Sequence, residues 1–514
     1  RLLMQGIEVE VAEKDFQMKN LRSYWDANPP SKTLSKGTYI IRLAQPMRPL
    51  INAILEFDPR MSTAFLQTER EHLEKDKGTR LYEVSAWSML QAYNIDAYVS
   101  AEIPSVKTTK IDQLPELPGE VINPEPAFGF IIDYRDDHAV DALLQLIELE
   151  HKVRVAKKPF QIEGRSFPRG SLLLRVNESP ASLSEDIQEI AESAHIRIYG
   201  VNTALSQQGP DLGGREFQLL TTPRIALLTG PAINMYNFGA LWYLLDYELK
   251  CRHSILNYNY FDDLDLRKYN VLVLPTTWGG PETYRKIFGE KDLKKLKEWV
   301  TNGGTLIGIG NGAAFLADSA TGISQVKLRR QALNELHLYE EAVQREEDAG
   351  KGRIDSLAIW EGKSATKDDK KEKQAEKKDV KELSEQDEQL RLYMPRGAIL
   401  RVDLNEEHWL TFGVGLKVPA IVYTSYAFLS KKPVQTAARF SEASQLRLSG
   451  LLWPEARTRW EKSAYATREA YGKGQVILFA GEPNFRSYSY GTARMLINSL
   501  LLGPGFGTQQ VVSW

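Results

Sequence analysis

The sequence predicts an α/β protein in which a doubly wound parallel sheet follows two smaller α/β modules. Three observations predict this class. Continuous apolar runs alternate with helical patterns over residues 223–335, as in a parallel sheet covered on both faces. A glycine-rich turn joins a buried strand to a helix within residues 304–318. Two blocks of the first 125 residues return in the same order within residues 126–222, which indicates a duplicated module.

Residues 1–125 are the first expected module, which we expect to continue from an upstream domain. The chain opens at Arg1, and residues 2–6 are typical of a helix that ends at a glycine. The pattern then predicts strands at 7–11 and 37–42, helices at 50–55 and 63–77, and a proline-rich linker at 104–126.

Residues 126–222 are the second expected module. A strand is predicted at 128–132, a helix at 138–150 and a strand at 152–156. Residues 9–17 match residues 153–161 without a gap, and residues 37–42 resemble residues 170–175. Two blocks that align in one order favour a repeat of the first module over chance similarity.

Residues 223–514 are the third expected unit. Buried strands are predicted at 224–228, 253–256, 270–275 and 305–309, and further strands at 398–402, 420–423 and 475–479 complete the same sheet. Residues 340–390 interrupt this unit with a charged segment. Because such a composition buries little apolar surface, we expect a disordered insertion or a frayed helix there.

The bulk composition narrows the possible partners. Of the 514 residues, 42% are apolar and 26% are charged, which is typical of a globular protein with large cores. The net charge of −2 gives no reason to expect a nucleic-acid partner. No run of 18 apolar residues occurs, so no membrane span is expected.

The turn within residues 304–318 has the shape of a nucleophile elbow. In such a turn, glycines allow a sharp passage from strand to helix, and one side chain is lifted above the sheet. Here Gly308, Gly310 and Gly312 surround Ile309 and Asn311, so the apex has no side chain that could attack a substrate. The sequence therefore predicts a site built for chemistry that lacks its nucleophile.

The turn resembles the elbow of class I glutamine amidotransferases, whose pattern is Gly-Ile-Cys-x-Gly. Gly308 and Ile309 match, Gly310 replaces the cysteine, and Gly312 closes the motif. The family's His-Pro-Glu signature is absent, because residues 479–483 contain Glu482 and no histidine. The resemblance implies a flavodoxin-like, amidotransferase-like domain that has lost the reaction, since a thiolate nucleophile also needs a base.

A candidate pocket lies where the predicted strands end, because open α/β sheets bind ligands at their carboxyl edge. Its six residues are Trp278, Gly279, Gly280, Gly310, Asn311 and Glu482. For residues 278–280 an ordinary turn between strand and helix is the favoured interpretation. For Glu482, together with Asn484 and Arg486, capping of the last helix is favoured over ligand binding. No catalytic residue and no metal ligand is assigned.

Other stretches, in order, resemble the region that follows the catalytic domain of large bacterial zinc carboxypeptidases. Among them are residues 37–41, 407–413 and 474–503. The resemblance implies a non-catalytic accessory region that supports an upstream peptidase domain through stabilisation, assembly or binding of a peptide or glycan substrate. It implies zinc only in that upstream domain, none in this chain, and a periplasmic or secreted protein.

Three alternatives stay open at this point. The chain is this accessory region, an amidotransferase-like module that binds a small molecule without catalysis, or a hydrolase with a non-cysteine mechanism. The hydrolase ranks last, because no Ser-His-Asp arrangement occurs at the elbow and no histidine lies near Gly310 in the sequence. A His-x-x-Glu pattern does occur, from His337 to Glu340, and the next histidine is His408. Because no buried strand precedes this pattern, a solvated helix face is favoured over a zinc site.

Overall fold

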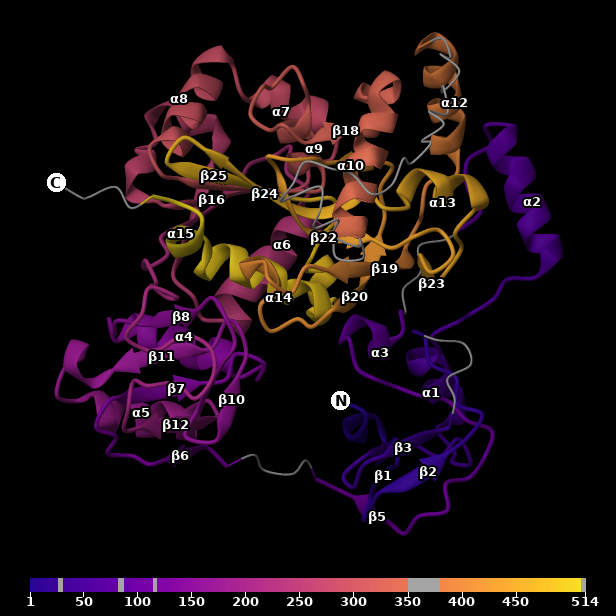
Figure 1. Ribbon diagram of the computed structural model, residues 1–514. Coiled ribbons are helices and arrows are strands. Elements are labelled where there is room, and N and C mark those ends of the chain that lie inside the picture. Colours follow the sequence, from indigo (N-terminus) through magenta and orange to yellow (C-terminus); the bar gives the residue numbers. More distant parts are fainter. Residues whose placement is uncertain (26–30, 82–86, 114–117, 350–379, 510–514) are drawn as a thin grey trace, which may run out of the picture.

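The computed structural model describes residues 1–25, 31–81, 87–113, 118–349 and 380–509 (Figure 1). The third unit fills most of the upper part of the view, and the second module and most of the first module form two lobes below it. Helix α2 (Thr63–Glu74) of the first module lies at the upper right, beside the third unit. The described residues are mixed α/β, as the sequence predicts.

Half of the third unit's sheet is parallel. Its strands lie in the order β15 (His253–Asn257), β14 (Ile225–Thr229), β16 (Val271–Leu274), β17 (Thr305–Ile309) and β25 (Gly474–Phe479), and each pairs in parallel with its neighbour. In chain order this is 2-1-3-4-5, the order of flavodoxin-like sheets. The predicted fold class is therefore confirmed by the strand pairing itself.

The other half of this sheet is antiparallel and extends from β25. Its path runs through β24 (Ala464–Tyr471), β22 (Gln435–Phe440), β19 (Ala398–Leu404) and β20 (Lys417–Val422), with β18 (Lys327–Leu328), β21 (Phe428–Leu429) and β23 (Arg447–Ser449) beside it. The strands predicted in the last third of the chain thus complete the sheet, as expected.

Helices cover the two faces of this sheet. They are α6 (Met235–Tyr243), α7 (Pro281–Ile287), α8 (Glu290–Thr301), α9 (Asn311–Ala317), α10 (Leu336–Ala349), α12 (Val380–Leu392), α13 (Pro454–Trp460), α14 (Tyr490–Leu501) and α15 (Gly503–Phe506). Residues 312–317 of α9 are all buried, which fixes the elbow in the core.

Both ends of the segment 340–390, where we expected a disordered insertion or a frayed helix, are helical. Residues 340–349 belong to α10 and residues 380–390 to α12. Asp387 of α12 is only 4% exposed, and the guanidinium group of Arg459 binds its carboxylate through two hydrogen bonds of 2.9 and 3.2 Å. A buried ion pair thus anchors a helix that has few apolar residues. The middle of the segment, 350–379, lies outside the described residues.

The second module has a sheet of order β13-β8-β11-β7-β12-β6. Its strands are β6 (Glu120–Ile122), β7 (Gly129–Ile132), β8 (Arg154–Ala156), β11 (Leu172–Arg175), β12 (Arg197–Val201) and β13 (Phe217–Leu219), and β9 (Phe160–Ile162) and β10 (Arg165–Phe167) form a hairpin. Helices α4 (Ala139–Glu148) and α5 (Leu183–Ser193) pack together on it. Because β6 pairs with β12, the sheet reaches back across the boundary expected at residue 125.

The second module packs against the third unit through α14. The Tyr134 hydroxyl donates to Oδ1 of Asn498 at 3.0 Å, and Nη2 of Arg494 donates to the Tyr134 carbonyl oxygen at 2.8 Å. Tyr134 and Asn498 are fully buried, so these bonds lie inside a continuous core.

The first module has a smaller sheet, β4-β1-β5, and a hairpin of β2 and β3. The elements are η1 (Leu3–Gln5), β1 (Val9–Ala12), β2 (Phe16–Met18), β3 (Lys32–Leu34), β4 (Tyr39–Ile40), α1 (Arg48–Leu55), α2 (Thr63–Glu74), α3 (Met89–Ala92) and β5 (Thr108–Ile111). Trp87 joins this module to the third unit, since its indole N–H donates to the Gly397 carbonyl oxygen at 2.9 Å.

Candidate functional site

The apex of the elbow is a position that only glycine fits. Gly310 has φ 53° and ψ −111°, and its N–H donates to the Phe479 carbonyl oxygen at 3.0 Å. A Cβ atom on Gly310 would lie 2.4 Å from Oγ1 of Thr276, which is closer than any ordinary contact. A Cβ atom on Gly312 would lie 2.2 Å from the Leu274 carbonyl oxygen. The backbone thus keeps the elbow shape, and a threonine hydroxyl fills the space beside its apex.

Thr276 connects this apex to Glu482. Thr276 follows β16, and its hydroxyl lies 3.4 Å from the Ile309 carbonyl oxygen, the last residue of β17. Glu482 follows β25, where the resemblance places the missing His-Pro-Glu signature. Burial raises the pKa of Glu482 to about 7, and a hydrogen bond with the Thr276 hydroxyl partly offsets this rise. Near neutral pH the carboxyl group therefore exchanges between its protonated and ionised forms.

The turn after β16 is tied to the elbow by Asn311. Its side-chain amide donates to the Thr277 carbonyl oxygen at 2.8 Å, and the Thr277 hydroxyl donates to the Gly280 carbonyl oxygen at 2.7 Å. Gly280 has φ 81°, which favours glycine, and Gly279 lies exposed beside it. Gly279 and Gly280 therefore form the backbone of the turn between β16 and α7.

Two aromatic side chains lie at the rim of this turn. Trp278 is 54% exposed and Tyr236, near the start of α6, is 70% exposed. Their rings meet edge to face at a centroid distance of 5.6 Å. The arrangement leaves apolar ring surface open to solvent beside the polar groups of the elbow.

Most of the six candidate residues therefore lie around a centre that sequence reasoning missed. Gly310 and Glu482 contact Thr276, and Asn311 contacts Thr277. Both threonines lie just after the buried run Val271–Leu274, separated from it by Pro275, so their place at a strand end was the only signal in the sequence.

The favoured capping role for Glu482 is wrong. The last long helix, α14, begins at Tyr490, and Glu482 contacts Thr276 instead. The side-chain amide of Asn484 donates to the Ala240 carbonyl oxygen of α6 at 2.9 Å. A short 3-10 helix at Phe485–Ser487 separates both residues from the start of α14.

The residues considered for a metal lie apart. His337 and Glu340 are exposed on α10, whereas His408 is buried and its Nδ1 accepts the Leu410 N–H at 3.2 Å. Burial lowers the pKa of His408 to about 4. Over the described ranges, no group of three or more His, Cys, Asp or Glu side chains is placed to hold a metal ion. The helices in those ranges also include none that is long and apolar enough to cross a membrane.

A separate polar recess lies near the other end of α9. It has a volume of about 390 Å³, and among the residues that line it are Glu282, Arg285, Asp318 and Asp387. Arg285 pairs with the buried Asp318, and Asp387 pairs with Arg459. Because these charges neutralise one another, we interpret the recess as part of a structural ion-pair network.

No family model and no curated protein matches the chain. The similar solved structures include glutamine amidotransferase-like proteins. One is described as a GMP synthase subunit from Thermoplasma acidophilum, with 10% identity over 55% of this chain and 94% of that chain and a TM-score of 0.29. Another is a glutamine amidotransferase from Thermotoga maritima, with 7% identity over 50% and 74% and a TM-score of 0.26.

A third similar structure is a beta-galactosidase from Bacillus circulans, with 9% identity over 68% of this chain and 45% of that chain and a TM-score of 0.28. TM-scores of this size carry no argument about fold or function. The fold assignment rests on the order and direction of the strands in the sheet.

Proposed function

We propose that the third unit is an amidotransferase-like module that binds a small molecule at the carboxyl edge of its parallel sheet and does not hydrolyse amides. One observation carries this proposal: Oγ1 of Thr276 lies 2.4 Å from the place where Gly310 would carry a Cβ atom. The space of a nucleophile is filled by the Thr276 hydroxyl group, which also lies 3.4 Å from the Ile309 carbonyl oxygen. Neither a thiol nor an imidazole is present at this elbow, and acyl transfer by this route needs both.

The groups around the elbow fit a neutral ligand with hydroxyl groups and one apolar face, such as a sugar. The exposed rings of Trp278 and Tyr236 offer surface for the apolar face. Glu482, with a pKa of about 7, donates a hydrogen bond to a hydroxyl group when protonated and accepts one when ionised.

Saturation-transfer NMR with two probes, N-acetylglucosamine and L-glutamine, tests this proposal. We expect the sugar to bind the wild-type protein and to bind Trp278→Ala about tenfold more weakly. Glu482→Gln should also weaken binding of the sugar. The matched control is Tyr247→Ala, which removes another exposed aromatic ring, 67% exposed, beyond the carboxyl end of α6.

Two results would overturn the proposal. One is sugar binding that is equally strong, or equally absent, in the wild type and in Trp278→Ala. The other is release of ammonia from L-glutamine by the wild-type protein, because this would show an amide-hydrolysing centre.

The accessory role beside an upstream zinc carboxypeptidase domain rests on the sequence resemblance alone. It stays a prediction, as do the zinc in that domain and the periplasmic or secreted location. Metal content and carboxypeptidase activity, measured side by side on this chain and on a protein that also carries the upstream domain, would test it.

A further inference from the structure

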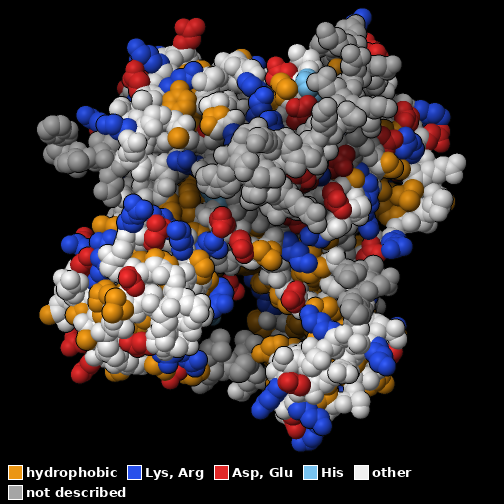
Figure 2. Space-filling view, viewed as in Figure 1, with side chains coloured by type: hydrophobic (Ala, Val, Ile, Leu, Met, Phe, Trp, Pro, Cys, Tyr) orange, Lys and Arg blue, Asp and Glu red, His pale blue; other side chains and the backbone are white. Residues whose placement is uncertain are grey.

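Charged side chains of both signs are mixed over the face of the protein that Figure 2 shows. Lys and Arg lie among Asp and Glu across the described residues of this face. A site for a charged ligand therefore depends on local pairing rather than on a broad field of one sign. The pairing of each arginine separates those that a carboxylate neutralises from those that can bind a ligand.

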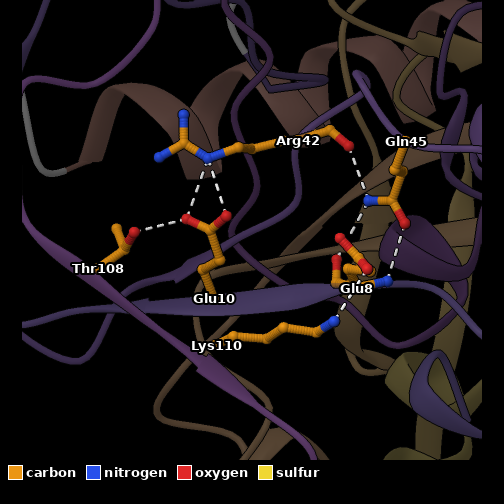
Figure 3. Close-up of polar contacts among 6 residues, drawn as sticks. All are labelled: Glu8, Glu10, Arg42, Gln45, Thr108 and Lys110. Carbon is orange, nitrogen blue, oxygen red and sulfur yellow. Dashed lines mark hydrogen bonds and ion pairs between the residues drawn. The ribbon is translucent and has the colours of Figure 1, made fainter.

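The arginine that follows β4 is an example of a neutralised one (Figure 3). Nε of Arg42 binds both carboxylate oxygens of Glu10 at 2.9 and 3.0 Å, and the Thr108 hydroxyl donates to Glu10 at 2.5 Å. Beside this group, Nζ of Lys110 donates to Glu8 at 2.8 Å. Because each of these charges has a partner of opposite sign, we interpret the cluster as a structural one.

The polar recess near the end of α9 is neutralised in the same way in its inner part. Arg285 of α7 pairs with the buried Asp318 and lies 3.0 Å from Glu282. Asp387 of α12 pairs with the buried Arg459 at 2.9 Å. These ion pairs hold α7, the end of α9 and α12 together as walls of the recess.

Two further arginines line this recess and come from different elements. Arg330 belongs to the short 3-10 helix η6 (Arg329–Gln331), and Arg391 lies on α12, one turn after Asp387. Both side chains are partly exposed. Among the described residues, no carboxylate lies within ion-pair distance of either guanidinium group.

Both arginines act on the side chain of Tyr426, which lies between β20 and β21. The guanidinium carbon of Arg330 lies 5.9 Å from the centre of the Tyr426 ring. Burial raises the pKa of Tyr426, and the positive charges of Arg330 and Arg391 partly offset that rise, whereas the charge of Glu282 adds to it. A Cβ atom on Gly280 would lie 3.2 Å from the Tyr426 hydroxyl. Two guanidinium groups and one hydroxyl group therefore gather beside the turn that carries Gly280.

The charges at this place favour an anion. Of the described carboxylates that line the recess, Glu388 is left over by the ion pairs, and it lies on the exposed side of α12. Arg330 and Arg391 thus face one unpaired negative charge. A guanidinium group matches the oxygens of a phosphate with two parallel donors. The recess volume of about 390 Å³ exceeds several times the roughly 30 Å³ that one water molecule takes up in the liquid, so a phosphate group fits.

The backbone that carries the two arginines is held by contacts outside the recess. The N–H of Arg329 donates to the Ala427 carbonyl oxygen at 2.9 Å, and Nε of Arg329 lies 3.9 Å from Asp387. The same Asp387 anchors α12 one turn before Arg391. Arg330 and Arg391 therefore start from fixed positions, which lowers the entropic cost of binding a ligand.

We propose that Arg330, Arg391 and Tyr426 bind a phosphate group, either free or on a small molecule. The two guanidinium groups and the Tyr426 hydroxyl donate hydrogen bonds to the phosphate oxygens. None of the three residues belongs to the proposed sugar site, so this inference does not rest on it.

A titration with inorganic phosphate, followed by phosphorus NMR at constant ionic strength, tests the inference. We expect saturable binding to the wild type, and Arg330→Gln and Arg391→Gln should each weaken it about tenfold. Glu388→Gln should tighten binding, because it removes a repelling charge. The matched control is Arg215→Gln in the second module, whose side chain is 96% exposed, and it should leave binding unchanged.

N-acetylglucosamine-6-phosphate is a second probe that separates the two sources of the phosphate group. If it binds more tightly than inorganic phosphate and Trp278→Ala removes this gain, the phosphate group belongs to the ligand of the elbow. If both probes bind equally well, the recess takes free phosphate. Either result supports phosphate binding in the recess, provided that Arg330→Gln weakens it.

Three results would overturn the inference. The first is no binding of phosphate to the wild-type chain. The second is binding that Arg330→Gln and Arg391→Gln leave unchanged in variants that circular dichroism shows to be folded. The third is equal weakening by Arg215→Gln, because the attraction would then be general. Binding of the unphosphorylated sugar tests the other site, so the failure of one proposal leaves the other standing.

Discussion

Replacing Gly310 by alanine should destabilise the third unit in two separable ways. Gly310 has φ 53° and ψ −111°, and holding a non-glycine residue in such a sparsely populated region costs about 1–3 kcal/mol. The new Cβ atom would also lie 2.4 Å from Oγ1 of Thr276, and overpacking of a buried contact costs about 1–3 kcal/mol more. We expect the free energy of unfolding to fall by about 2–6 kcal/mol in total.

A double-mutant cycle separates the two effects. In Thr276→Ala the hydroxyl is gone, and the nearest remaining Thr276 atom, Cβ, would lie 3.7 Å from the new Cβ atom, an ordinary contact. Gly310→Ala should therefore cost about 1–3 kcal/mol less in the Thr276→Ala background than in the wild type. The backbone strain should remain in both.

The assay is urea unfolding of the four proteins, followed by circular dichroism. Gly239→Ala is the control, because Gly239 lies within α6 with nothing near its missing Cβ atom, and this change should be neutral or stabilise by up to about 1 kcal/mol. If Gly310→Ala costs the same with and without the Thr276 hydroxyl, the hydroxyl does not fill the apex and the reasoning fails.

Three further predictions follow from burial. Glu482 binds a proton more tightly in the folded state, with a pKa of about 7 against an ordinary 4.5. Its contribution to the free energy of unfolding therefore falls as pH rises between these two values. Glu482→Gln should remove that fall, which thermal melting at about pH 5 and about pH 8 would measure. Asp387→Ala leaves the buried Arg459 without its carboxylate partner and should lower the free energy of unfolding in urea by about 3–5 kcal/mol. The control Glu388→Ala, on the exposed side of α12, should change this free energy by less than about 0.5 kcal/mol. Trp87→Ala should weaken the packing of the first module on the third unit by about 3–5 kcal/mol. Limited proteolysis should then release the first module faster than in the wild type.

The parallel half of the sheet could be predicted because its strands are apolar runs between helical patterns. The run Val271–Leu274 is buried at every position, as expected for a strand covered on both faces. The antiparallel half could not be predicted in the same way. β20 (Lys417–Val422) is also buried almost throughout, so its composition does not reveal its direction. Direction follows from the connections between strands.

The candidate site was predicted in part for a similar reason. Gly310 stood out because it replaces the cysteine of a known motif, and Glu482 because it lies where that family's His-Pro-Glu signature is expected. Thr276 did not, since a threonine after a buried strand is common and its contact with the elbow arises only when β16 and β17 pair. Tyr236 was missed because its contact with Trp278 depends on where α6 packs.

The charged segment shows a limit of reasoning from composition. Asp387 stands in a run of charged residues, and nothing near it in the sequence suggests burial. Its partner Arg459 lies on α13, far along the chain, and only the fold brings the two together. Composition predicts how much apolar surface a segment buries, but it does not reveal a distant ion-pair partner.

The titration of Glu482 tests the central account most directly. Protein labelled at the side-chain carboxyl carbon of glutamate, compared with Glu482→Gln for assignment, gives the midpoint by NMR. The account predicts a midpoint of about 7 in the wild type and a higher one in Thr276→Val, which removes the hydrogen bond that lowers the pKa. A midpoint near the ordinary 4.5 in the wild type would contradict it, because the carboxyl group would then be solvated and the elbow would lack the partly buried polar centre of the proposed binding site.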